Sequence, residues 1–195
     1  MADRGARERM VFSAAQLLRR HGVTATGMRD VVAHAAAPRG SLGHYFPGGK
    51  QQLVNEAVEW AGRYAGNRVP RFRAALGESA TPSGLFAPMV GQWVEEWDRV
   101  GFEAGGCPVV AATVDCADEN TSTRAAVAEA FTAWRRAVAE VLVELGVPGD
   151  RAGALATLMV SSLEGAILIA RAERDPRALH AVATELAPLL DGALT

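Results

Sequence analysis

Residues 38–50 contain side chains suited to contact with a nucleic acid. Arg39 can form paired hydrogen bonds with a phosphate or a guanine edge, and Ser41 and His44 can donate or accept hydrogen bonds. Two glycines lie between them, and glycine lets a backbone approach a ligand closely. These residue types, so close together in the chain, predict a surface that reads the major groove of DNA.

The residues just before this segment are predicted to form a short helix that helps to position it. Thr26 can cap the start of the helix through its hydroxyl, and Val31, Val32 and Ala35 give the helix an apolar face. Pro38 ends it, because proline lacks the amide that a continuing helix uses. Proline also suits the first position of a following helix.

A second helix is expected over residues 39–45. Leu42 and Phe46 lie four residues apart and would face inward, where they anchor the helix to a core. The residues that would face outward are Arg39, Gly40, Ser41, Gly43, His44 and Tyr45. Two short helices joined by a tight turn form a helix-turn-helix unit, whose second helix enters the major groove.

Lys50 is the only lysine of the chain and stands at the predicted start of a long helix, after a Pro-Gly-Gly turn. A cation is electrostatically unfavourable at a helix N-terminus. The placement is explained if a DNA phosphate shares the site, because helix amides and an ammonium both attract it. The alternative is a surface lysine without a ligand. A nucleotide-binding P-loop is excluded, because Gln51 follows the lysine where that motif needs Ser or Thr.

The charge of the chain is distributed unevenly. Residues 1–50 contain eight Lys or Arg and three Asp or Glu, which give +5, whereas the other 145 residues contain 12 basic and 19 acidic residues, which give −7. A basic segment on an acidic body suits a protein that grips a polyanion at one end. Arg4 and Arg7 of this segment could reach a DNA backbone. The alternative is a solvated surface that happens to be rich in arginine.

The whole chain is expected to be all-α, because alanine is abundant and alternating strand patterns are absent. A first helix over residues 4–21, stopped by Gly22, would brace the helix-turn-helix unit. A linking helix is expected over residues 50–66, either extended or broken near Pro70. The remaining helices are predicted at residues 83–100, 108–116, 121–145, 150–174 and 176–190.

Residues 7–55 resemble the N-terminal domain of the TetR family of one-component bacterial repressors. The residues that carry the resemblance are Phe12, Ala15, Leu18, Gly22, Val23, Thr26, Val31, Ala35, Gly40, Ser41, Leu42, Tyr45, Phe46, Lys50 and Leu53. The runs 38–42, 44–50 and 105–109 also resemble the branch that contains lincomycin-resistance repressors. The resemblance implies a helix-turn-helix DNA-binding domain at residues 1–49 and a ligand-binding and dimerisation domain at residues 50–195.

A near-palindromic double-stranded DNA operator, bound by a cytoplasmic homodimer, is the first partner that the resemblance implies. The predicted DNA-binding residues are Thr26, Arg29, Pro38, Arg39, Gly40, Ser41, Gly43, His44, Tyr45 and Lys50. Three features depart from the family pattern: Ala36 replaces the usual turn glycine, Gly43 replaces a usual tyrosine, and one residue is added before Lys50. Alanine at that turn costs stability if the position needs a positive φ.

A small-molecule inducer is the second partner that the resemblance implies. Aromatic residues recur along two predicted helices, and such stripes usually form plain core, although they also line drug-sized pockets. The predicted ligand-binding residues are Phe86, Val90, Trp93, Trp97, Cys107, Val110, Phe131, Trp134 and Glu164. Glu164 has two interpretations, a hydrogen-bonded structural carboxylate or the polar anchor of the ligand cavity.

The last two predicted helices are expected to form the homodimer interface. Residues 152–170 contain one charge, Glu164, and nearly resemble a membrane span, but a charge in mid-segment is costly in hydrocarbon. Burial on several sides explains the segment better, so no membrane partner is expected. Leu179 and Leu190 belong to an apolar stripe on the last helix, which allows a four-helix interface between two copies. Pro188 is expected to kink or shorten that helix.

No catalytic site, metal site or cofactor is predicted. Cys107 and Cys116 lie nine residues apart without a neighbouring histidine, so buried inert thiols are favoured over a zinc site or a redox switch. The four histidines are scattered, so no hydrolase triad can be argued. Two rival hypotheses remain: an all-α enzyme with an aromatic pocket, for which a nucleophile and base are missing, and a DNA-binding regulator without a small-molecule ligand.

Overall fold

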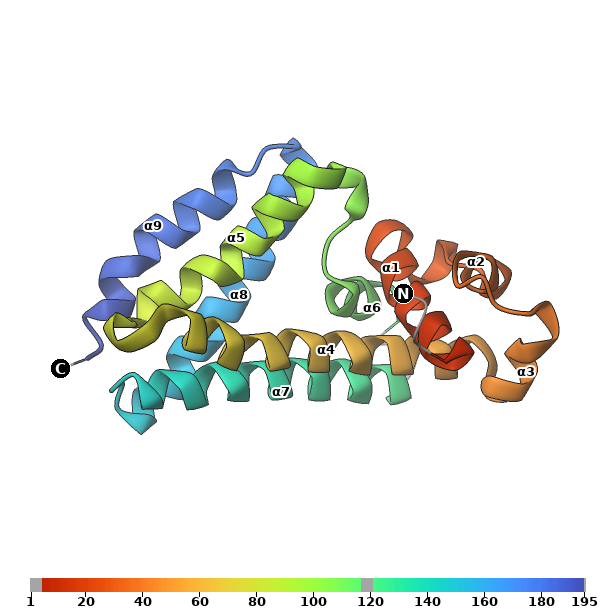
Figure 1. The fold of residues 1–195 in the computed structure, drawn as a ribbon, viewed down its shortest axis with the longest axis horizontal. Helices are drawn as coiled ribbons and strands as arrows, with labels where there is room; N and C mark the ends of the chain where they lie inside the picture. The colour runs from red at the N-terminus through yellow and green to blue at the C-terminus, as the bar shows by residue number, and fades with distance from the viewer. Residues whose placement is uncertain (1–4, 117–120, 195) are drawn as a thin grey trace. The chain divides into compact units, whose positions relative to one another are not determined.

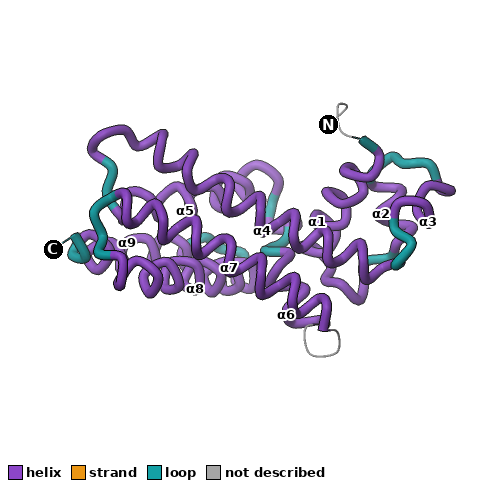
Figure 2. Tube along the Cα trace, turned by 90° about the horizontal axis from the view of Figure 1, so that it is seen from below, coloured by secondary structure: helices purple, strands orange, loops and turns teal. Residues whose placement is uncertain are grey.

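The structure, a computed structural model, describes residues 5–116 and 121–194, although not the side chains of Arg39 and Cys116. Over these residues the chain is helix and loop without a strand, as Figure 2 shows, so the predicted all-α class is confirmed. The chain divides into two compact units, the first from residues 1–63 and 105–131 and the second from residues 64–104 and 132–195. This division differs from the predicted boundary at residue 50, because the start of the long linking helix belongs with the N-terminal helices.

The first unit combines the N-terminal helices with one helix from the middle of the chain (Figure 1). Its elements are α1 (Ala6–Ala25), α2 (Met28–His34), the 3₁₀ turn η1 (Arg39–Ser41), α3 (Leu42–Tyr45), the first part of α4 (Gly49–Leu76), α6 (Pro108–Cys116) and the first part of α7 (Thr121–Glu144). The helix predicted at residues 108–116 is confirmed. Arg4, at the predicted start of the first helix, lies outside the described residues.

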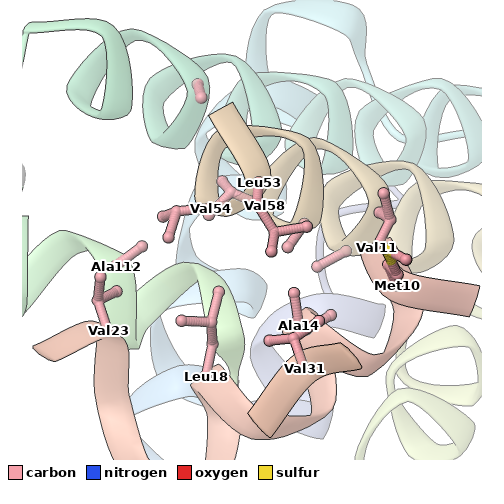
Figure 3. Packing of buried hydrophobic residues seen from close by; sticks show 14 of the residues in the cluster. Met10, Val11, Ala14, Leu18, Val23, Val31, Leu53, Val54, Val58 and Ala112 are labelled. Atoms are coloured by element: carbon pink, nitrogen blue, oxygen red, sulfur yellow. The ribbon is translucent and has the colours of Figure 1, made fainter. Parts of the chain in front are cut away.

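Apolar side chains from five helices, α1, α2, α4, α6 and α7, form the core of the first unit (Figure 3). The labelled members are Met10, Val11, Ala14, Leu18 and Val23 from α1, Val31 from α2, Leu53, Val54 and Val58 from α4, and Ala112 from α6. None of these residues is more than 8% exposed. Burying a side chain of the size of Val or Leu stabilises a fold by about 1.5–3 kcal/mol, so this core holds the N-terminal helices in place.

The loop before α6 is held to α1 by two hydrogen bonds between Gly106 and Arg19, one from the main chain and one from the arginine side chain. The Gly106 amide donates to the Arg19 carbonyl at 2.9 Å, and Arg19 Nε donates to the Gly106 carbonyl at 2.9 Å. Gly105 has a φ of 87°, and a Cβ at this position would overlap the Arg19 carbonyl. Glycine is therefore required at position 105 both by the backbone conformation and by the close approach.

The second unit contains three helices that lie side by side, α5 (Pro82–Val100), α8 (Gly149–Glu173) and α9 (Arg177–Asp191) (Figure 1). It also contains the later parts of α4 and α7 and the 3₁₀ turns η2 (Gly77–Ser79) and η3 (Phe102–Ala104). Asp191 ties the end of α9 to the start of α5, because its two carboxylate oxygens accept from the Ser83 amide at 2.9 Å and the Ser83 hydroxyl at 2.6 Å. The predicted helices of this unit are confirmed, with ends displaced by a residue or so.

Pro70 and Pro188 lie inside helices instead of ending them, as Pro88 does in α5. α4 is one helix of 28 residues that passes through Pro70, so extension rather than a break is confirmed. α9 continues past Pro188 to Asp191, so the expectation that Pro188 would shorten it is wrong. Pro70 and Pro188 are exposed, which leaves water to satisfy the carbonyl groups that lose an amide partner.

α8 is long and apolar enough to cross a membrane by length and composition, but half of its most apolar stretch is buried within the protein. A core helix of a soluble protein passes the same test. Glu164 in the middle of this helix is only 7% exposed. Leu168 and Ile169 are 51% and 50% exposed, so α8 buries one side and leaves apolar side chains on another.

Candidate nucleic-acid interface

The first helix of the recognition unit, α2, is shorter than predicted. It starts at Met28 after Gly27, which occupies the N-cap position without a side-chain cap. Thr26 instead ends α1: its hydroxyl donates to the Gly22 carbonyl at 2.7 Å, and the residue is buried. The predicted Thr26 cap is therefore wrong, because α2 begins one residue later than expected and Gly27, not Thr26, occupies its N-cap position.

The turn after α2 comes before Pro38 rather than at it. Ala35 is the C-cap, and Ala36 follows with a φ of 47°. The Ala36 amide donates to the Ala33 carbonyl and the Ala37 amide to the Val32 carbonyl, each at 3.1 Å. A left-handed residue that turns these amides back onto the last helical carbonyls ends a helix without any proline. The turn does need a positive φ at position 36, so the stability cost that was expected for alanine under this condition applies.

The predicted recognition helix over residues 39–45 consists of two shorter elements, η1 and α3. Pro38 precedes them with an extended ψ of 133°, so it stands before the helical segment instead of at its first position. The Ser41 amide and hydroxyl both bond to the Pro38 carbonyl, at 3.0 and 2.6 Å. The amide bond reaches back three residues, which is the bonding pattern of a 3₁₀ turn, and the hydroxyl bonds to the second lone pair of the same carbonyl.

The inward face of this segment follows the prediction. The outward face does so only in part, because Ser41 and Tyr45 are half-buried and Tyr45 packs against the core. Phe46 is 1% exposed and Leu42 packs against the core, so both anchor the segment. Gly40, Gly43 and His44 are exposed. A Cβ at either glycine would meet no atom within 4 Å, so the backbone here is open to a close approach from outside.

Tyr45 and Arg29 complete the predicted contact surface, with Arg39 described only by its backbone. Tyr45 is half-buried, and its ring lies edge-on to the His44 ring with 5.1 Å between centroids. Arg29 is exposed on the first turn of α2. No observation tests whether these residues contact DNA, and their roles remain predictions.

Lys50 lies on the first turn of α4, after Gly49, whose φ of 69° accommodates the residue added before the lysine. The lysine is half-buried rather than free in solvent. Its Nζ donates to the Thr24 carbonyl at 3.2 Å. The sequence suggested either a phosphate contact or an idle surface lysine, and it carried no signal for this contact across 26 residues.

Arg7 supports the turn that precedes α4, a role that the sequence did not indicate. Its Nη2 donates to Glu56 at 2.7 Å, and its guanidinium lies 5.4 Å from the centroid of the Phe46 ring. Glu56 also accepts from Gln52 at 2.9 Å, and the Gln52 side chain accepts from the Gly48 amide at 2.9 Å. A partly exposed ion pair contributes only about 0–1 kcal/mol, so the network matters mainly by orienting the turn.

A groove of about 980 Å³ lies in the first unit. Its walls carry charges of both signs and amide groups, and Val11 and Trp60 supply its apolar part. The lining residues are Arg7, Glu8, Val11, Gly48, Gln51, Gln52, Asn55, Glu56, Glu59, Trp60, Arg63 and Ser122. None of the nine residues predicted to bind a ligand lines this groove.

The predicted ligand-binding residues are divided between the two units. Phe86, Val90, Trp93, Trp97, Trp134 and Glu164 belong to the second unit, and Cys107, Val110 and Phe131 to the first. In the second unit all but the half-buried Trp93 are at most 7% exposed. The rings of Trp93 and Trp97 lie 5.9 Å apart between centroids, and Phe102 continues the row at 4.8 Å from Trp97. Burial of this kind fits both a core and a closed ligand site.

Among the described side chains, no group of three or more His, Cys, Asp or Glu could hold a metal ion. Cys107 is half-buried, while the side chain of Cys116 lies outside the described part of the chain. The proposed contrast between inert thiols and a redox pair is therefore not tested.

Two family models match the chain. The model described as bacterial regulatory proteins of the tetR family matches residues 13–57. The model described as the C-terminal domain of LmrA/YxaF-like transcriptional regulators matches residues 82–185. Together they cover the helix-turn-helix segment and most of the later helices.

Relatives and solved structures agree with these matches. An uncharacterized HTH-type transcriptional regulator of Mycobacterium tuberculosis is 40% identical over 191 residues, covering 95% of this chain and 94% of the relative. The HTH-type transcriptional regulator LmrA of Bacillus subtilis is 26% identical over 184 residues, covering 94% and 96%. A TetR transcriptional regulator from Legionella pneumophila shares the fold with a TM-score of 0.81 at 18% identity, covering 97% of this chain and all of that chain. Regulatory protein TetR from Rhodobacter sphaeroides does so with a TM-score of 0.78 at 24% identity, covering 92% and 96%.

The N-terminal helices and their exposed recognition segment define a helix-turn-helix DNA-binding protein. The chain belongs to the TetR family of bacterial transcriptional regulators, and within it to the LmrA/YxaF-like branch. Members of this family are DNA-binding regulators and not enzymes, so the rival enzyme hypothesis is set aside.

Proposed function

We propose that this protein is a ligand-responsive repressor that binds a near-palindromic operator as a homodimer and is released by a small-molecule inducer in the cytoplasm. The observation that carries the proposal is the exposed segment of η1 and α3, in which Gly40, Gly43 and His44 face outward while Phe46 anchors the segment. An open backbone beside a hydrogen-bonding ring suits contact with base edges and phosphates in the major groove.

The proposed DNA contacts have different physical roles. Arg39 and His44 are proposed to read base edges, and Arg29 and Lys50 to contact phosphates. The phosphate contacts give affinity and register, whereas the base contacts give sequence preference. Two copies of the unit, related by a twofold axis, would read two half-sites of opposite orientation, which is why the operator is expected to be nearly palindromic.

The inducer is proposed to bind in the second unit, among the aromatic residues of α5 and α7 and the buried Glu164. The neighbouring rings of Trp93 and Trp97, of which Trp93 is only half-buried, support an aromatic ligand surface. A ligand can favour a conformer in which the two DNA-binding domains of the dimer have the wrong spacing for the operator. By linkage, such a ligand must weaken operator binding.

A regulator without a small-molecule ligand is the second candidate. It is favoured by the near-complete burial of Phe86, Val90 and Trp97, which fits an ordinary core. A panel of small apolar cations and drugs separates the two candidates. A compound that quenches tryptophan emission and also releases the operator supports the inducer, whereas quenching by none supports this second candidate.

A gel shift on the DNA upstream of the protein's own gene, in graded salt, tests the proposed function. The wild type should give a discrete shift that saturates as dimers. Arg39→Ala should cost about 1–3 kcal/mol of binding, and Lys50→Ala should reduce the slope of the salt dependence by about one unit for each phosphate that the lysine neutralises. Arg71→Ala, which removes an exposed charge further along α4, is the matched control and should bind as the wild type does. A shift no stronger than on unrelated DNA would contradict the proposal.

A further inference from the structure

The end of α1 is held by a carboxylate from α6. Gly22 has a φ of 80° and a ψ of 174°, which break the regular helix and leave a last turn over residues 23–25. Asp115 Oδ2 accepts from the amide of Val23 at 2.6 Å and, more weakly, from that of Thr24 at 3.4 Å. Asp115 therefore acts as an N-cap for this turn, and it is supplied from 92 residues further along the chain.

The same turn holds the only lysine of the chain. Lys50 Nζ donates to the Thr24 carbonyl at 3.2 Å, so the main chain of Thr24 connects Asp115 on α6 with Lys50 on α4. A Cβ at position 22 would lie 2.6 Å from Asp115 Oδ2, so a larger residue there would push the carboxylate away. All of these residues belong to the first unit.

The hydrogen bond from Lys50 to Thr24 compensates for the unfavourable electrostatic position of the lysine. The N-terminus of α4 repels a cation, so an unsupported lysine side chain would extend into solvent. The Thr24 carbonyl offsets this repulsion and fixes the direction of the side chain. An ammonium carries three donors, so a bond to Thr24 leaves donors for a phosphate. A donor that is already oriented loses less conformational freedom on binding.

We propose that Asp115 is a positioning residue for DNA binding. By fixing the main chain of Thr24, its carboxylate fixes the place where Lys50 presents its ammonium. Asp115 itself does not touch DNA in this arrangement. The inference rests on the proposed function, in which Lys50 contacts a DNA phosphate, and it adds a residue of α6 that no helix-turn-helix motif includes.

The single lysine allows a test that needs no DNA. The full chain is pulse-labelled with acetic anhydride, and mass spectrometry gives the acetylation rate of Lys50 relative to the α-amino group of the same molecule. Asp115→Ala should raise this ratio about 3-fold, as expected when one modest hydrogen bond is removed. Asp115→Asn, which keeps an acceptor oxygen, should lie between the alanine variant and the wild type.

Val114→Ala is the matched control, because Val114 neighbours Asp115 on α6 and is 79% exposed. Its labelling ratio should equal that of the wild type. Asp115→Ser, which also shortens the side chain, repeats the test if the alanine variant does not fold by circular dichroism. Equal labelling ratios in the wild type and in a folded Asp115→Ala or Asp115→Ser variant would overturn the proposal.

A double-mutant cycle then measures the consequence for DNA binding. Dissociation constants on the fragment upstream of the protein's own gene are compared across graded salt for Asp115→Ala, Lys50→Met and the double variant. Asp115→Ala should weaken binding about 3-fold and lower the salt slope, and the double variant should bind no more weakly than Lys50→Met.

The outcomes separate this inference from the proposed function. Additive losses with an unchanged salt slope would overturn the positioning role and leave Asp115 as a stabilising cap. A wild type that does not prefer this fragment over unrelated DNA would count against the proposed function instead, and the labelling ratios would still decide whether Asp115 positions Lys50.

Discussion

At the scale of single residues, Ala36 has the least favourable backbone conformation in the recognition unit. Its φ of 47° lies in the left-handed region, which costs a residue with a Cβ about 1–2 kcal/mol. Glycine avoids this cost but has a larger entropy in the unfolded chain, worth about 0.4–1 kcal/mol. The difference leaves a net gain for glycine at this position.

Ala36→Gly should therefore raise the free energy of unfolding by about 0.5–1 kcal/mol, measured by urea denaturation. Ala33→Gly is the matched control, because Ala33 is also exposed but lies inside α2. The control should lower the free energy of unfolding by about 1 kcal/mol. If both variants are destabilised to the same extent, the turn is not strained by its alanine.

At the scale of elements, α4 is the helix that follows the recognition segment of η1 and α3 and continues into the second unit. Pro70 lies inside it and removes the amide that would bond to the carbonyl four residues earlier. Val69 beside it is fully buried, so tertiary packing holds the helix in place across the proline. Packing here outweighs a local preference that costs roughly 3 kcal/mol.

Pro70→Ala should raise the free energy of unfolding by up to about 3 kcal/mol and the melting temperature with it. Pro148→Ala is the control: Pro148 is the exposed residue before the first turn of α8, where no intrahelical amide bond is missing. That change should lower the stability slightly, because it adds freedom to the unfolded chain. Calorimetry measures both, and an unchanged melting temperature for Pro70→Ala would mean that the helix has already adapted to its proline.

At the scale of the whole molecule, the exposed apolar side chains of the last two helices suggest how two copies assemble. Leu168, Ile169 and Leu189 are 51%, 50% and 46% exposed, and they lie on α8 and α9. Exposed leucines and isoleucines on adjacent helices are typical of an isologous helical interface. We expect this face to form the homodimer of the proposed repressor.

Leu168→Glu should shift the protein from dimer to monomer at micromolar concentration in sedimentation velocity, because the interface would have to bury a charge. Val143→Glu is the matched control, since Val143 is 50% exposed on α7 and lies outside this face. Operator binding should weaken when the dimer dissociates, because a single DNA-binding domain then contacts a single half-site. A Leu168→Glu variant that remains dimeric would place the interface elsewhere.

The sequence by itself was sufficient for those features that depend on near neighbours in the chain. The apolar spacing of Val31, Val32 and Ala35 predicted the buried face of α2, and Leu42 and Phe46 predicted the anchored face of the recognition segment. Helical periodicity repeats every three or four residues, so these faces can be read locally. The motif was also specific enough to indicate the family.

Local rules failed where two local preferences competed. Thr26 was expected to cap α2, but its hydroxyl bonds to the Gly22 carbonyl. Pro38 was expected to end α2, but the helix had already ended at the left-handed Ala36. In both cases two arrangements were compatible with the residue types, and the residue types alone did not indicate which of the two the chain adopts.

Only the tertiary structure decided the long-range contacts that position the candidate DNA-binding surface. Arg7 meets Glu56 across 49 residues, Arg19 meets Gly106 across 87, and Asp115 caps the end of α1 across 92. Each of these residues, taken alone in the sequence, is an ordinary charged side chain with many possible partners. Its role depends on which helices the core brings together, and helical periodicity carries no information about a partner so far away in the chain.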